Sequence, residues 1–219
     1  MKKIKALLLC LSVLSVIFFT ACKSKNNQPY ITQNQNAWSR NACGAFSMAY
    51  FLAETGQIPA SKIEETAKKF YARIKFDPQA GMGEYSDPFK IAKEIAPYVQ
   101  TVSFGMNISN PQTPGEKLMS IFTSGVDMSM FTDITDFSAS LKKGDYVIEI
   151  VVPQAYIDTL APLHNPLHYV LTYWKGDTLY TLDPGRGKEE PRQNFIDGTT
   201  AKWCFFNSGI FLTPISNER

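Results

Sequence analysis

One cysteine and one histidine have the types and surroundings that a thiol nucleophile requires. Cys43 precedes an apolar stretch, Ala45–Leu52, that is typical of a buried helix, so we expect the cysteine at the N-terminus of that helix. The unpaired N–H groups and the dipole at such an end favour the nucleophilic thiolate form, and a nearby imidazolium favours it further. His168 is the candidate partner. The alternative is that Cys43 is a small buried apolar residue.

Asp183 is the candidate acid, because it lies with His168 in a predicted β-hairpin. With a two-residue turn at Gly176–Asp177, Asp183 lies diagonal to His168 on the same face of the hairpin. A turn at Lys175–Gly176 would place the two residues directly opposite each other, whereas a three-residue loop would put them on opposite faces. We predict that Asp183 orients the imidazole. The alternative is an ordinary turn aspartate, since Asp-Pro-Gly is also a common turn sequence.

Four further features lie near these residues in the predicted structure. Gly44 is expected to let a substrate backbone approach without a Cβ in the way. Trp174 shares the face of His168 and is expected to shield it from water or to pack in the core. His164 precedes Asn165-Pro166 and is placed in a loop, at the substrate rim or in solvent. The loop Gly81–Tyr85 is either an edge of the substrate cleft or a plain loop.

Two sequence patches resemble the papain-fold cysteine peptidases of the bacteriocin-processing type, the C39-like group. The first contains Asn-x-Cys-Gly-x-x-Ser-x-Ala around Cys43, and the second contains His-Tyr-Val-Leu-Thr from His168 followed by Leu-Asp-Pro-Gly around Asp183. The resemblance covers roughly residues 33–52 and 165–187. It implies a papain-like fold and thiol hydrolysis of an amide bond. It also implies Cys43 as nucleophile, His168 as base and Asp183 as orienting acid.

The sequence departs from this family at two positions. Ala45 follows Cys-Gly where the family usually has proline, and Ala37 stands where the family has the glutamine of its oxyanion hole. A short insertion in the loop would restore Gln35 to that role, and Gln33 and Asn36 lie nearby. Gln35 is therefore the predicted side-chain donor, beside the backbone N–H of Cys43. A site without a side-chain donor would be a weakened or inactive enzyme.

The N-terminus predicts export and a lipid anchor. Lys2, Lys3 and Lys5 precede an apolar run that is too short to span a membrane, which is typical of a signal peptide over residues 1–21. The small residues before Cys22 resemble the lipobox of a bacterial lipoprotein, with Cys22 acylated. An ordinary secretory signal is the alternative. Residues 22–35 are then a polar tether, and residues 36–219 form one domain outside the cytoplasm, on the outer membrane or cell surface in a diderm host.

Charge and composition exclude several classes of function. Loss of the three signal lysines takes the formal charge from +2 to about −1, so nucleic-acid binding is not expected. Two histidines and two remaining cysteines, Cys43 and Cys204, predict no metal site and no cofactor. A disulfide between these cysteines is the alternative in an oxidising compartment. The expected partners are a peptide or protein substrate and the membrane, and the chain is expected to act as a monomer.

The order of the predicted elements indicates the α+β class, with N-terminal helices packed on a C-terminal antiparallel sheet. Capping signatures and apolar periodicity predict helices over residues 43–55, 61–74, 87–97, 113–122 and 134–141. Alternating and β-branched segments predict strands over residues 145–152, 168–174, 178–183 and 203–212.

The sequence leaves three functions open. The first is a lipid-anchored extracytoplasmic cysteine peptidase that works through a thioester at Cys43. The second uses the same three residues for other acyl chemistry, as a cell-wall amidase or a transglutaminase-like protein. The third is a catalytically inactive surface-binding lipoprotein that keeps the fold.

Overall fold

The computed structural model describes residues 30–77, 84–122, 127–153, 167–196 and 203–215. Its helices are α2 (Cys43–Glu54), α3 (Ile63–Ile74), α4 (Pro88–Ile95), α5 (Pro114–Phe122), α6 (Phe137–Ser140) and α8 (Arg192–Ile196). Its strands are β1 (Val99–Met106), β2 (Phe131–Asp133), β3 (Tyr146–Pro153), β4 (His168–Lys175), β5 (Thr178–Asp183), β6 (Lys188–Pro191) and β7 (Trp203–Pro214). Residues 1–29 lie outside the described ranges, and with them the predicted signal peptide and the predicted lipidation site, Cys22.

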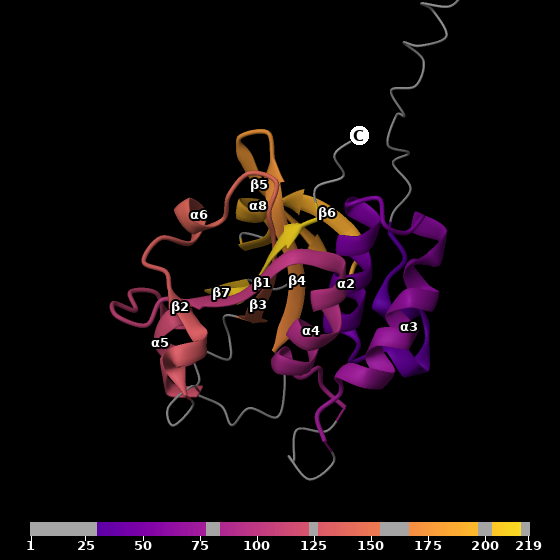
Figure 1. Ribbon diagram of the computed structural model, residues 1–219, viewed down its shortest axis with the longest axis horizontal. Coiled ribbons are helices and arrows are strands. Elements are labelled where there is room, and N and C mark those ends of the chain that lie inside the picture. The colour runs from indigo at the N-terminus through magenta and orange to yellow at the C-terminus, as the bar shows by residue number, and fades with distance from the viewer. Residues whose placement is uncertain (1–29, 78–83, 123–126, 154–166, 197–202, 216–219) are drawn as a thin grey trace, which may run out of the picture.

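The strands form one seven-stranded sheet in the order β2-β1-β7-β3-β4-β5-β6. Each neighbouring pair is antiparallel except β1 with β2, which are parallel. The protein is therefore a mixed α+β fold with a mostly antiparallel sheet. Figure 1 shows this sheet in the centre, with α2, α3 and α4 on one side and α5 on the other. Within the described residues, no helix is long and apolar enough to cross a membrane.

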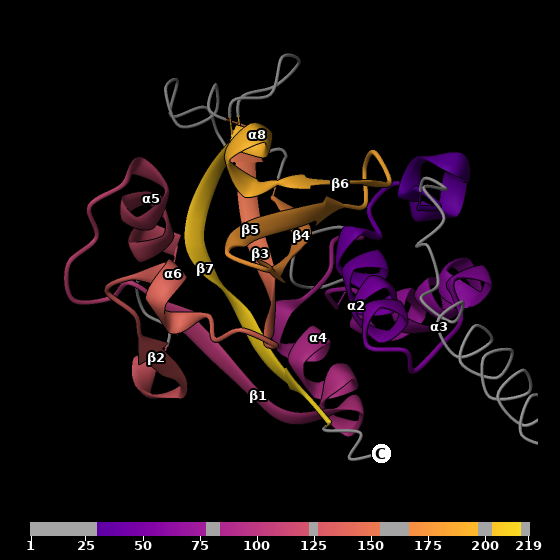
Figure 2. The same cartoon turned by 90° about the horizontal axis from the view of Figure 1, so that it is seen from above.

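Helix α2 is the central element of the larger core. Its residues from Cys43 to Leu52 are all buried, because the helix is apolar on every side and is enclosed by α3, α4 and the sheet. Tyr169 and Leu171 of β4 belong to the same apolar cluster. Each fully buried Phe or Leu side chain stabilises the fold by about 1.5–3 kcal/mol. This packing fixes α2 against β4 (Figure 2).

The other face of the sheet contains a buried ion pair. Glu149 of β3 is 0% exposed, and its Oε1 accepts a hydrogen bond from Nη2 of Arg192 at 2.6 Å. The guanidinium also stacks on Phe205 of β7, 3.7 Å from the ring centroid. Burial raises the pKa of Glu149, although Arg192 and Thr172 partly offset that effect. Loss of one partner of such a buried pair destabilises a protein by about 3–5 kcal/mol, so this contact holds α8 and β7 to the centre of the sheet.

Several local predictions are confirmed. The first helix ends before Gly56, which adopts a φ of 73°, and Asp87 caps α4 through the N–H groups of Phe89 and Lys90. Thr113 and Glu116 form the predicted capping box at α5. The four predicted strands correspond to β3, β4, β5 and β7.

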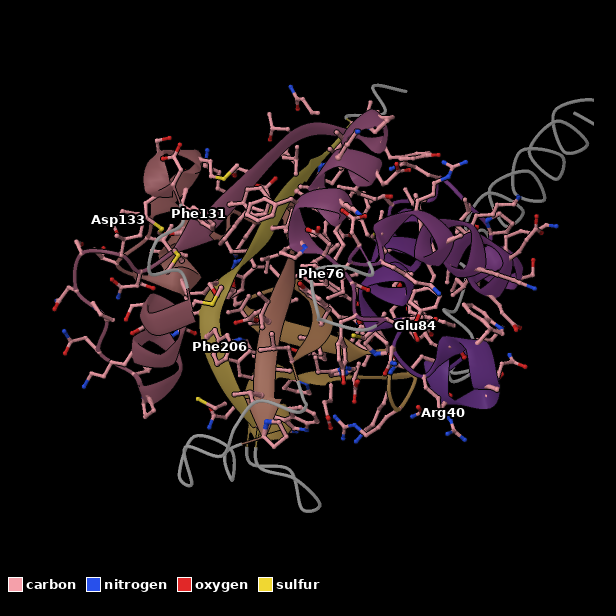
Figure 3. The ribbon with its side chains drawn as sticks, turned by 90° about the horizontal axis from the view of Figure 1, so that it is seen from below. Arg40, Phe76, Glu84, Phe131, Asp133 and Phe206 are labelled. Atoms are coloured by element: carbon pink, nitrogen blue, oxygen red, sulfur yellow. The ribbon has the colours of Figure 1, made fainter. Side chains whose placement is uncertain are left out.

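Other local predictions are wrong. The predicted capping box at Ser61 does not form, because residues 60–62 make a 3₁₀ turn and Lys62 becomes the N-cap of α3 without a side-chain bond. The helix predicted over residues 134–141 is reduced to α6, with Asp136 as its cap. Strands β1, β2 and β6 were not predicted from the sequence. Figure 3 shows Phe131 and Asp133 of β2 at the opposite end of the molecule from Arg40, which precedes α2.

Candidate active site

Cys43 is the first residue of α2, and its side chain is buried, with 5% of its surface exposed. The N-cap residue, Ala42, provides no side-chain hydrogen bond to the first turn. Tyr71 and Tyr169 lie close enough for a charge on Cys43 to act on both phenols. Burial, with smaller effects of Glu84 and Cys43, raises the pKa of Tyr71 to about 12. Burial also raises the pKa of Tyr169. Cys43 therefore occupies an enclosed position at a helix N-terminus.

His168 is the first residue of β4 and connects Cys43 to Asp183. Its Nε2 lies 2.7 Å from Oδ1 of Asp183, and its ring lies near enough to the Cys43 side chain for Cys43 to help raise the pKa of His168. Because Nε2 contacts the carboxylate, Nδ1 is the nitrogen that remains for the thiol. Only 12% of the histidine side chain is exposed. The structure thus brings the three residues together in one chain of contacts.

The register of the β4–β5 hairpin is what places Asp183 beside His168. Lys175 pairs with Thr178, as a two-residue turn at Gly176–Asp177 requires, and Leu171 pairs with Leu182. The two residues therefore share a face, as predicted. The turn after β5 then supplies further donors to the carboxylate of Asp183. The Gly185 N–H donates to Oδ1 at 2.8 Å, and Nε of Arg186 donates to Oδ2 at 2.7 Å.

The electrostatics of the pair favour opposite charges. Burial lowers the pKa of His168, but the hydrogen bonds and charges of Asp183 and Cys43 outweigh burial and raise the pKa to about 10. Burial raises the pKa of Asp183, but His168 and Arg186, with the Gly185 N–H, lower it to about 2. At neutral pH the site therefore holds an imidazolium beside a carboxylate.

The aromatic neighbour of His168 is Trp203 and not Trp174. The Trp203 ring, at the start of β7, lies 5.4 Å from the His168 ring between centroids. Trp174 lies further along β4 and donates its Nε1–H to the carbonyl oxygen of Leu141 at 2.6 Å. The prediction that Trp174 shields His168 is therefore wrong, because the two residues lie six positions apart along β4. Trp203 was missed because the sheet order brings β7 beside β3 only in three dimensions.

The structure distinguishes two glutamines in the segment before α2. Gln35 is exposed, whereas Gln33 is buried at 6% exposure. Nε2 of Gln33 donates to the carbonyl oxygen of Arg40 at 3.0 Å, and its buried Oε1 has no hydrogen-bond partner among the described residues. Gln33 is also joined to the turn after Asp183, since its backbone N–H donates to the carbonyl oxygen of Pro184 at 2.9 Å. Gln33 is therefore the buried amide of this segment, whereas Gln35 is exposed.

Gly44 serves packing and not substrate approach. A Cβ at this position would lie 2.7 Å from Cδ1 of Ile91 and 2.8 Å from Cβ of Ser86. These contacts face α4 and Ser86, two residues before it, so the prediction of an open approach for substrate is wrong. The close approach of α4 to the first turn of α2 needs a residue without a side chain.

The remaining candidate residues are simply placed. The structure contains no disulfide between Cys43 and Cys204, which was the alternative considered for these two residues. His164 and residues 81–83 lie outside the described ranges, whereas Glu84 accepts a hydrogen bond from the Tyr71 hydroxyl through its carbonyl oxygen. In the ranges that the structure describes, no group of three His, Cys, Asp or Glu side chains could hold a metal ion.

Comparisons with protein-family models, curated proteins and solved structures find no match to this chain. The function is therefore argued from the residues and their geometry.

We predict that Gly44→Ala destabilises the protein by about 1–3 kcal/mol, because the added methyl group overpacks the contact with Ile91. Without this contact the change would be neutral or favourable, since alanine forms helix more readily than glycine. Urea unfolding measures the free energy. Adding Ile91→Val removes the Cδ1 atom and should recover part of the loss. A fully stable Gly44→Ala variant would contradict the packing role.

Proposed function

We propose that the protein is a papain-like cysteine peptidase that hydrolyses peptide bonds through a thioester at Cys43. The single observation that carries this proposal is the buried chain of contacts from Cys43 through His168 to Asp183. A nucleophile that contacts a base, with that base held by a third group, is the arrangement required for acyl transfer. The sequence resemblance to C39-like peptidases supports the same three roles.

The reaction follows from the charges of the resting site. The Cys43 thiolate attacks the carbonyl carbon, and the imidazolium of His168 then donates a proton to the departing amine as the C–N bond breaks. The neutral imidazole next takes a proton from water, and the resulting hydroxide attacks the thioester. The C–S bond breaks, the carboxylic acid leaves, and the thiolate–imidazolium pair is restored.

Two groups assist this sequence. Asp183 holds the ring of His168 in one orientation and stabilises the imidazolium, which is the part that an acid plays in a triad. The negative charge that develops on the carbonyl oxygen needs N–H donors. The backbone N–H of Cys43 and the side-chain amide of Gln33 are the donors proposed here, with Gln35 as the alternative predicted from the sequence.

The proposed location is the extracytoplasmic face of a membrane, with an acyl anchor at Cys22. Seven residues lie between Cys22 and Tyr30, and the eight steps from Cys22 to Tyr30 would reach about 28 Å in a fully extended chain. The domain would therefore act on peptides or proteins near the membrane surface.

We predict that the chain without residues 1–22 cleaves members of a peptide library, detected by mass spectrometry. Cys43→Ser and His168→Ala should abolish cleavage, whereas Cys204→Ser should retain it because Cys204 lies outside the triad. Transfer of the acyl group to an added amine instead of water would favour the transglutaminase-like alternative. Release of peptides from cell-wall fragments alone would favour the amidase. Inertness toward all three substrates would contradict enzymatic function.

We predict that Gln33→Ala lowers kcat by about 10²–10³, as the loss of one oxyanion donor does, and leaves KM nearly unchanged. Gln35→Ala is the matched variant in the same segment, and its exposed side chain predicts only a small change. Steady-state kinetics on a cleaved peptide makes the comparison. A large loss in Gln35→Ala with an active Gln33→Ala would restore the original assignment.

A further inference from the structure

The segment that precedes α2 lies against the turn that begins with Asp183. We call residues 30–34 the strap and residues 183–187 the acid turn. The Tyr30 N–H donates to the carbonyl oxygen of Gly187 at 3.0 Å, and the Gln33 N–H donates to that of Pro184 at 2.9 Å. Nδ2 of Asn34 donates to the carbonyl oxygen of Gly185 at 2.7 Å. Three hydrogen bonds therefore join the strap to successive parts of the acid turn.

The strap and the acid turn fit without spare room at Gly187. This glycine has a φ of 61°, and a Cβ there would lie 2.1 Å from the carbonyl oxygen of Tyr30. The Gly187 N–H also donates to the carbonyl oxygen of Asp183 at 2.8 Å, which closes the acid turn. Any side chain at this position must displace the strap or open the turn.

The other side of the strap is fastened to the nucleophile helix. The Tyr50 hydroxyl of α2 donates to the carbonyl oxygen of Ile31 at 2.6 Å. The Tyr30 hydroxyl donates to the carboxylate of Glu54 at the end of α2, and the Tyr30 ring packs edge-on against Tyr50 at 5.3 Å between centroids. The strap thus connects the helix that begins with Cys43 to the turn that begins with Asp183.

We propose that the strap is a positioning segment that holds the acid turn on α2, so that Asp183 orients His168 only while the strap is docked. This inference rests on the proposed function only in calling Asp183 the orienting acid. The strap is the C-terminal part of the predicted tether, residues 22–35, so that prediction is wrong for residues 30–34, which pack on the domain. The completeness of the site therefore depends on the segment through which the chain is predicted to be anchored. Displacement of the strap would leave Cys43 and the hairpin folded but lower the contribution of Asp183.

Two glycines provide a matched test. Gly187→Ala introduces a Cβ against Tyr30, whereas Gly144→Ala introduces an alanine at another positive φ, 95°, outside the β4–β5 hairpin and with nothing within 4 Å of the added atom. Each variant is made in a chain that lacks residues 1–22 and carries Cys43→Ala and His164→Gln, which leaves His168 as the histidine that is titrated. NMR titration then measures the pKa of His168, and Asp183 is the partner left to raise it.

We predict that Gly187→Ala lowers the pKa of His168 by about one unit or more, a tenfold change in proton affinity, because the contact with Asp183 weakens. Gly144→Ala should leave the pKa at the value of the parent. Equal pKa values in the two folded variants would overturn the proposal. The titration needs no substrate, so failure of peptide cleavage would refute the proposed function and leave this comparison intact.

A second pair of variants decides the question if Gly187→Ala does not fold. Asn34→Ala removes the hydrogen bond from Nδ2 to the carbonyl oxygen of Gly185, whereas Asn36→Ala removes a hydrogen bond from Nδ2 to the carboxylate of Glu64 of α3, away from the acid turn. Asn34→Ala should lower the pKa of His168 by a smaller amount, because one of the three strap contacts is lost. Asn36→Ala should not lower it. An unchanged pKa in Asn34→Ala, with the fold retained, would contradict the role of the strap.

Discussion

The two-residue turn at Gly176–Asp177 is the constraint on which the site depends. Side chains alternate between the faces of a strand, so a shift of one residue in the β4–β5 register would move Asp183 to the face opposite His168. With Lys175 paired to Thr178, both side chains lie on one face and Nε2 of His168 meets the carboxylate at 2.7 Å. The charges that favour a reactive thiol follow from this contact.

Cys43 reaches the hairpin through the packing of a separate element. Helix α2 is apolar on all sides, so it is driven into the core and lies against the face of β4 that carries Tyr169 and Leu171. His168 lies at the first position of the same strand, where its side chain meets the N-terminus of α2. The absent side chain at Gly44 allows α4 to approach this first turn closely. The nucleophile is therefore positioned by burial and the base by register.

Parts of the structure that signal themselves locally could be predicted from the sequence. The start of α4 could be predicted because Asp87, Pro88 and the two residues that follow carry the whole capping signal. The β4–β5 hairpin could be predicted because two strand-like segments flank the turn at Gly176–Asp177. Strand β1 escaped prediction because its burial does not alternate, and Lys188–Pro191 resembles a polar loop because three charged residues occupy an edge strand.

The site shows the same division between local and tertiary information. Cys43, His168 and Asp183 were identifiable because each has a local signature. Three features could not be identified: the contact of Trp203 with His168, the burial of Gln33, and the strap. Each depends on contacts between segments far apart in the chain. Gly44 was assigned the wrong role because its neighbour Ile91 belongs to another helix.

The most direct test of this account is the pH dependence of alkylation by iodoacetamide, measured at each cysteine by mass spectrometry. Cys204 is the internal reference, since it lies outside the triad and its Sγ contacts the carbonyl oxygen of Phe205. The account predicts fast modification of Cys43 at about pH 6, well below the ordinary range of a thiol, and a loss of this reactivity in His168→Ala. Equal and slow modification of both cysteines would contradict the thiolate–imidazolium pair and with it the proposed enzyme.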